Sequence, residues 1–119
     1  MWAVEFDDEF EGDFANLHQD VQDELLAQLD VIRRLGPLSK RPRVDTLKGS
    51  RYPNMKELRF SAAGGEWRVA FAFDPRQKAV VLVAGDKSGS DSGRRFYRML
   101  ISTADQRFGR HLERLKTKR

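Results

Sequence analysis

The segment MKELRFSAAGGEWRVAFAFD, residues 55–74, reads as a β-hairpin with one arginine on each of its two strands. Successive side chains of a strand point to opposite faces, so one face receives the large apolar side chains Leu58, Phe60, Trp67, Val69, Phe71 and Phe73. Arg59 and Arg68 then lie together on the other face, beside the small Ala70 and Ala72. Like charges on adjacent strands repel, and an anion bound between them removes the repulsion. The pattern predicts a phosphate site, with the alternative that each arginine pairs with a carboxylate or lies on an aromatic ring.

Further cations come close to this face in the predicted arrangement. Lys87 ends the third predicted strand, Lys56 begins the first, and the preceding loop carries Lys48 and Arg51. Such a surface suits RNA, because RNA carries its own nucleophile, the 2′-hydroxyl, beside each phosphodiester. A protein that holds the scissile phosphate in line and offsets the charge on its oxygens can cleave RNA without a metal ion. The groups suited to proton transfer are the lysines, the two histidines, Tyr52 and Tyr97.

Other chemistries find little support in the sequence. His18 and His111 lie far apart and the chain has no cysteine, so we expect no metal site and no cofactor. The segment GDKSGSDSG, residues 85–93, has the composition of a flexible linker and matches neither a nucleophile elbow nor a phosphate-binding Walker pattern.

The length and composition predict one globular domain, residues 1–119, with a single core. No apolar run is long enough to cross a membrane, and the acidic N-terminus does not resemble a secretory signal. The absence of cysteine fits a reducing compartment. We therefore expect a soluble cytoplasmic protein with no membrane partner.

Charge is distributed unevenly along the chain. Residues 1–32 contain ten acidic residues and no Lys or Arg, which gives a local charge of −10. Residues 33–119 hold all 22 basic residues and have a local charge of +14. This asymmetry indicates either a polyanionic partner or neutralisation of one segment by the other within the fold.

The order of elements predicts an α+β fold with a small antiparallel sheet. A strand over residues 2–6 precedes a helical region that Asp7 or Asp8 can cap, and Gly36 and Pro37 end that region. The helical region is either one long helix or two short ones broken near residues 16–19. Three strands follow a cationic loop over residues 38–54, and a last helix, which Asp91 or Ser92 can cap, completes the chain; the strands span residues 55–60, 66–74 and 78–87. We expect the N-terminal helices to pack on the aromatic face of the sheet and the arginine face to stay open.

The segments LKGSRYPNMKELRF, EWRVAFAFD and AVVLVAGDKSG, in this order and spacing, resemble the RelE/ParE superfamily of toxins from type II toxin–antitoxin modules. Within it the chain is similar to the HigB-like, phage-Gp49-like branch, over most of its length. The resemblance implies a RelE-like fold and a ribosome-dependent endoribonuclease that inhibits translation by cutting mRNA through metal-independent 2′-hydroxyl attack. It also implies a cognate antitoxin, expected to be a helix-turn-helix protein of a neighbouring gene.

The resemblance also implies roles for individual residues. Arg68 matches the strand arginine that holds the phosphate, Lys87 stands where a basic residue closes the third strand, and Tyr97 lies near the place of a C-terminal tyrosine, although Phe96 could be the aligned residue. Arg59 is structural or phosphate-binding, and the remaining expected RNA contacts are Lys48, Arg51 and Lys56. The chain lacks the paired lysines and the loop histidine that some relatives carry, which leaves the general base open; His111 is expected to be interfacial or solvated.

Two other functions fit the same sequence. A ParE-like protein would have the same fold and would inhibit DNA gyrase without cutting RNA. A non-catalytic nucleic-acid-binding module would need only the positive segment.

Overall fold

The computed structural model describes residues 1–89 and 93–117. In chain order its elements are β1 (Ala3–Phe6), α1 (Asp8–Ala15), α2 (Gln19–Leu35), the 3-10 turn η1 (Gly36–Leu38), β2 (Val44–Thr46), β3 (Met55–Ala62), β4 (Gly65–Phe73), β5 (Lys78–Asp86) and α3 (Gly93–Thr117). These elements confirm the predicted α+β class. The predicted cap of the last helix, Asp91 or Ser92, lies outside the described residues.

The strands form one sheet in the order β1-β5-β4-β3-β2. The neighbours β2/β3, β3/β4 and β4/β5 are antiparallel, whereas β1 runs parallel to β5, so the sheet is mixed at one edge. β3 and β4 are joined by a two-residue turn in which Ala63 and Gly64 have φ angles of 50° and 76°. Positive φ at both central positions is the geometry that matches the twist of a tight hairpin. β3 therefore runs two residues beyond the predicted range of 55–60, whereas β4 begins and ends one residue earlier than the predicted range of 66–74.

The helical region after β1 is two helices, because the chain leaves helical geometry between Ala15 and Gln19. Asp7 caps α1 and accepts hydrogen bonds from the backbone N–H groups of Glu9 (3.0 Å) and Phe10 (3.3 Å). Gly36 ends α2 with a φ of 55°, and a Cβ atom at this position would lie 2.2 Å from the Trp2 ring. Glycine is therefore required there both for its backbone conformation and for its size.

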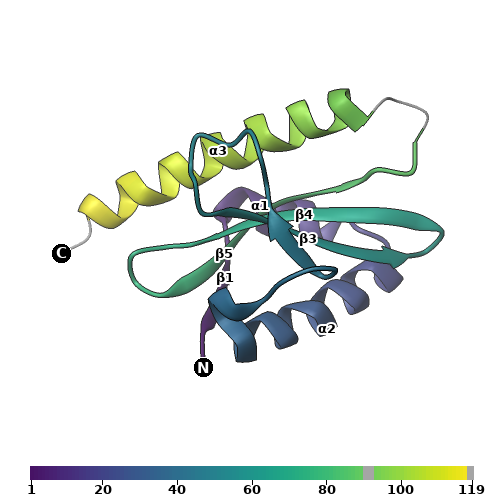
Figure 1. The fold of residues 1–119 in the computed structure, drawn as a ribbon, viewed down its shortest axis with the longest axis horizontal. Helices are drawn as coiled ribbons and strands as arrows, with labels where there is room; N and C mark the ends of the chain where they lie inside the picture. The colour runs from purple at the N-terminus through teal and green to yellow at the C-terminus, as the bar shows by residue number, and fades with distance from the viewer. Residues whose placement is uncertain (90–92, 118–119) are drawn as a thin grey trace.

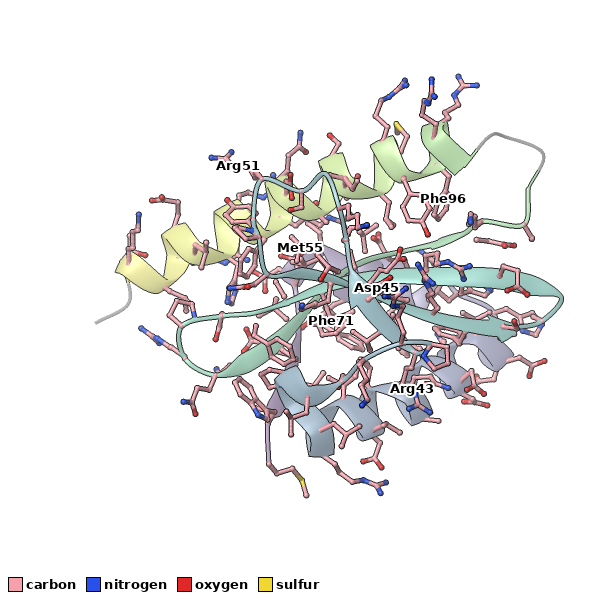
Figure 2. The ribbon with its side chains drawn as sticks, in the orientation of Figure 1. Arg43, Asp45, Arg51, Met55, Phe71 and Phe96 are labelled. Atoms are coloured by element: carbon pink, nitrogen blue, oxygen red, sulfur yellow. The ribbon has the colours of Figure 1, made fainter. Side chains whose placement is uncertain are left out.

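One face of the sheet packs against α1 and α2. Its buried cluster takes Phe10, Leu25 and Ile32 from the helices, together with Leu58 and Phe71 from β3 and β4. In Figure 1 α2 runs along this face, and Figure 2 shows Phe71 directed toward it. The predicted aromatic face is therefore the face that the N-terminal helices cover.

The opposite face is not open along its whole length, contrary to the expectation above. α3 crosses it in Figure 1, and a second buried cluster joins Leu100, Ala104 and Phe108 of α3 to Met55 and Ala70 of the hairpin. The small side chains of Ala70 and Ala72, which suggested an open face, instead allow this helix to pack closely on the sheet. A last helix was predicted, but the side of the sheet on which it packs was not.

The loop before β3 also differs from the prediction. Val44–Thr46 form the short edge strand β2, which pairs with β3 from Lys56 to Leu58. Three residues are too few for the alternation of apolar and polar side chains to stand out in a sequence. No helix among the described residues is long and apolar enough to cross a membrane.

Candidate active site

Arg59 of β3 and Arg68 of β4 are direct cross-strand partners, as the alternation of the hairpin predicted. The same face carries Glu57, two residues before Arg59, opposite Ala70. The Glu57 side chain is only 3% exposed. A buried carboxylate therefore lies on the same face of the sheet as the two arginines.

Arg59 is paired with acidic side chains. Its Nε and Nη2 both donate to Oε1 of Glu57, at 2.8 and 2.6 Å, and its Nη2 lies 3.6 Å from a carboxylate oxygen of Asp45 on β2. The hydrogen bond to Glu57 raises the pKa of the guanidinium. For this arginine the alternative of an internal carboxylate partner is the one that the structure shows.

Arg68 has different surroundings. Its Nη1 donates to the backbone carbonyl of Trp67 at 2.9 Å, while its Nε is buried and has no hydrogen-bond partner. Among the described residues it forms no ion pair. The guanidinium is half-buried and has no carboxylate partner among the described residues, so the part of it that is not buried is free to bind an anionic oxygen.

Tyr97, on the second turn of α3, lies against this group. Burial raises the pKa of the Tyr97 phenol; the neighbouring Arg68 guanidinium opposes this shift through a hydrogen bond, and Glu57 adds to it. Nζ of Lys87 sits 5.4 Å from the centroid of the Tyr97 ring. The structure thus brings Arg68, Lys87 and Tyr97 together, with Glu57 and Arg59 beside them.

The start of α3 is held in place by an aromatic contact. The ring of Phe96 packs edge-on against Tyr97, with centroids 5.3 Å apart, and it also lies over Gly85 of β5. A Cβ atom at position 85 would be 2.9 Å from that ring, so the glycine allows α3 to approach the sheet here. Of the two aromatic residues considered from the sequence, Tyr97 is the one that lies among the cations, and Phe96 supports it.

The other expected RNA contacts do not all join this cluster. Lys56 lies on the opposite face, since it pairs with Phe71, and its Nζ is 3.3 Å from the Thr46 hydroxyl. Arg51 belongs to the loop before β3 and lies over the ring of Tyr52. Figure 2 shows it well separated from Phe96, which is at the start of α3. Lys48 is exposed in the loop that packs on α3 through Gly49 and Ile101.

The two histidines have structural positions. His111 is 4% exposed, and its Nε2 forms a hydrogen bond of 2.8 Å with the buried carboxylate of Asp74. The expectation that His111 is interfacial or solvated was therefore wrong. His18 caps α2 by accepting a hydrogen bond from the backbone N–H of Asp20 at 3.1 Å. In the described part of the chain, no group of three His, Asp or Glu side chains is arranged to hold a metal ion.

Glu57 is the member of the cluster that sequence reasoning missed. Its place could have been inferred, because residues 57, 59 and 68 share one face by the same alternation that paired the arginines. What the sequence does not contain is its depth of burial, which depends on α3 covering this part of the sheet.

Acidic residues near the N-terminus neutralise part of the basic segment. Arg107, Arg110 and Arg114 follow one another at helical spacing on the second half of α3 and form ion pairs with Asp7, Asp8, Glu9 and Asp13. Arg94 and Arg98, on the first turns of α3, are exposed and form no ion pair with a described residue. The unneutralised charge of α3 therefore lies at the end that carries Tyr97.

Comparison with known proteins is consistent with the resemblance seen in the sequence. A family model described as phage derived protein Gp49-like matches residues 12–109. Two toxin candidates of Mycobacterium tuberculosis are each 40% identical to the chain: HigB2 over 97 residues, which are 81% of this chain and 47% of the relative, and HigB3 over 94 residues, which are 79% of each. The chain thus spans about half the length of HigB2.

A solved structure has a similar fold. The free state of a mutant of the E. coli toxin RelE aligns with a TM-score of 0.61 at 16% sequence identity, over 89% of this chain and 96% of that one. The likeness to RelE is one of fold, and it agrees with the predicted RelE-like arrangement.

Proposed function

The chain belongs to the family of phage-derived Gp49-like proteins, and we propose that it is the toxin of a type II toxin–antitoxin module that cuts mRNA on the ribosome. The observation that carries this proposal is the meeting of Arg68, Lys87 and Tyr97 on one face of the sheet, where Arg68 forms no ion pair with a described residue. Ribosomes work in the cytoplasm, which is where the protein would act.

Arg68 and Lys87 would hold the phosphodiester that is cut. Their charges offset the negative charge that grows on the nonbridging oxygens as the 2′-oxygen attacks phosphorus. The 2′-hydroxyl gives its proton to water as its oxygen bonds to phosphorus. The bond from phosphorus to the 5′-oxygen then breaks, which leaves a 2′,3′-cyclic phosphate and a 5′-hydroxyl. Because the ribose hydroxyl is the nucleophile, this step uses no metal ion.

Tyr97 would donate the proton that the leaving 5′-oxygen requires. Burial raises the pKa of its phenol, so the group keeps its proton at neutral pH and suits the role of acid rather than base. Glu57 is too deeply buried to reach RNA, and its role would be to position Arg59 and Tyr97. Among the cations expected from the sequence, Lys48 and Arg51 would contact RNA outside the reacting group.

The test is cleavage of a defined mRNA on programmed ribosomes in the presence of EDTA, read by primer extension. We expect cuts at a fixed position in the codon of the decoding site, and none in mRNA without ribosomes. Intact mRNA together with inhibition of DNA supercoiling by gyrase would contradict the proposal and favour the ParE-like activity. RNA binding with neither effect would favour the non-catalytic module.

A cognate antitoxin follows from the same proposal. Co-expression with the small protein encoded beside this gene should restore growth, and the two proteins should purify together. Neighbouring genes that encode no protein able to restore growth would contradict this part of the proposal.

A further inference from the structure

A groove of about 650 Å³ lies outside the cluster described above, at the edge of the sheet. It runs between α2, from Glu24 to Leu35, the segment over residues 38–43 and the outer edge of β3. β2 stops pairing with β3 at Leu58, and beyond it the Arg59 N–H donates to the Arg43 carbonyl at 2.8 Å. The groove therefore opens where the edge strand ends.

The walls of this groove combine an apolar surface with a cationic rim. Leu38 is 78% exposed and Leu35 is 43% exposed, which is unusual for large apolar side chains. The rim carries Lys40, Arg41 and Arg43. Apolar faces that accept bases or riboses, next to cations that follow phosphates, are the two features with which proteins bind single-stranded nucleic acid.

The carboxylate that lines the groove already has a hydrogen-bond partner. Glu24, the one acidic residue among the described residues that line it, accepts a hydrogen bond from Nε2 of Gln28 at 2.7 Å. Oε1 of Gln28 in turn accepts from Nε of Arg43 at 2.6 Å. This chain fixes the Arg43 guanidinium at the wall and leaves the donors on its two Nη atoms for a ligand.

The groove adjoins the candidate active site at Arg59. Arg59 is among the residues that line the groove, and its guanidinium is bonded to Glu57, which lies beside Tyr97. A strand that leaves the cluster past Arg59 would pass round the outer edge of β3 into the groove. An isolated acidic peptide could use the rim charges, but it would not require this connection to the reacting group.

We propose that this groove holds the part of the mRNA strand that adjoins the cleaved phosphodiester, with phosphates on Lys40, Arg41 and Arg43 and a base or ribose on Leu35 and Leu38. The inference rests on the proposed function, because it takes the same strand as the ligand. It adds a second contact region, on the opposite side of Arg59 from Tyr97, that would fix the register of the RNA before cleavage.

The first test is charge reversal in Lys40→Glu/Arg41→Glu. Both side chains are exposed and bear no buried contact, so the fold should be kept. The matched control is Arg33→Glu/Lys116→Glu, which makes the same change of charge on exposed residues outside the groove. We expect the ribosome concentration for half-maximal cleavage to rise at least about tenfold for the groove variant, with the maximal rate changed less than about threefold, and neither to change for the control. Equal behaviour of the two variants would overturn the inference.

The second test is photo-crosslinking of mRNA that carries 4-thiouridine beside the decoding-site codon, on programmed ribosomes bound to Arg68→Ala. We expect mRNA crosslinks within residues 35–43; crosslinks of this segment to ribosomal RNA alone, or to an antitoxin peptide alone, would overturn the inference. Cleavage by the wild type without mRNA crosslinks in the groove would overturn the inference and leave the proposed function standing. Crosslinks of mRNA in the groove without any cleavage by the wild type would support the groove as an RNA site and contradict the proposed nuclease function.

Discussion

At the level of single residues, the two arginines that face each other across β3 and β4 have different surroundings. Arg59 donates twice to the buried Glu57, whereas Arg68 keeps a buried donor without a partner. A guanidinium that is half-buried without a carboxylate partner is stabilised when an anion binds to it. This difference is the reason why we propose Arg68 as the phosphate ligand and Arg59 as the residue between the cluster and the groove.

The protonation of Tyr97 can be measured directly. Its pKa should lie above the ordinary value of 10.0, since burial disfavours the phenolate. The contribution of this shift to stability is present below pH 10 and is lost as pH rises through the folded-state pKa. The measurement is an ultraviolet titration of the phenolate in the wild type and in Tyr97→Phe, which retains only Tyr52. A difference titration centred at or below pH 10 would contradict the assignment of Tyr97 as an acid.

Glu57→Gln tests whether the buried carboxylate positions Tyr97 through its charge. Because Glu57 raises the pKa of Tyr97, removing the charge should lower the midpoint of the Tyr97 titration and also slow cleavage. Glu66→Gln is the control, since Glu66 is exposed on the neighbouring strand. A slower rate with an unmoved Tyr97 midpoint would show that Glu57 acts only on packing.

At the level of elements, Arg107 joins three parts of the fold. Its side chain is 12% exposed, and its Nη1 donates to Asp13 of α1 and to the Leu82 carbonyl of β5, both at 2.7 Å. This arginine therefore fixes α3 and α1 to the same strand. Arg110, one turn later, pairs with Glu9 but is 49% exposed.

Arg107→Ala should lower the free energy of unfolding by about 2–4 kcal/mol, because it leaves a carbonyl and carboxylates without their partner. Arg110→Ala should cost less than about 1 kcal/mol, as exposed ion pairs do. Urea unfolding of both variants measures the difference. Equal destabilisation would mean that burial does not distinguish the two pairs.

The sequence predicted most of these elements because their signals are local. The apolar spacing of α2 and α3, the Asp7 cap, the Gly36 stop and the alternation in the hairpin each lie within one element. The packing of α3 on the arginine face was missed, because small side chains such as Ala70 and Ala72 are compatible with an open surface or a close helix. Edge strand β2 was missed because it is so short.

The same reasoning explains how much of the site could be predicted. The pairing of Arg59 with Arg68 follows from parity, and it was found. Lys56 was assigned to the wrong side because its position at the strand start was considered without its parity, which differs from that of Arg59. The meeting of Lys87 with Tyr97 depends on how α3 packs, and only the resemblance to a family suggested it.

At the level of the whole molecule, charge is sorted along α3. The acidic N-terminal segment pairs with the arginines of the second half of α3, while Arg94 and Arg98 remain on the first half. The sequence left internal neutralisation and a polyanionic partner as alternatives. Internal neutralisation applies to the second half of α3, and the positive charge that could attract a polyanion remains on the first half. The end that stays positive is the end nearest the candidate active site.

The salt dependence of ribosome binding should reflect this distribution of charge along α3. Each arginine that contacts phosphate releases counterions, so Arg94→Ala and Arg98→Ala should each reduce the slope of log affinity against log salt by roughly 0.7–1 in ribosome binding. Arg110→Ala should leave the slope unchanged, because its charge is already paired with Glu9. Equal slopes for all three variants would contradict the sorting of charge.

The most direct test of the central claim is single-turnover cleavage of mRNA on programmed ribosomes by Arg68→Ala. Arg33→Ala, which removes an exposed arginine of α2, is the matched control. We expect Arg68→Ala to cut at least about 100-fold more slowly than the wild type while it unfolds at the same temperature, and the control to cut at the wild-type rate. A folded Arg68→Ala that cuts within a few-fold of the wild type would contradict the account.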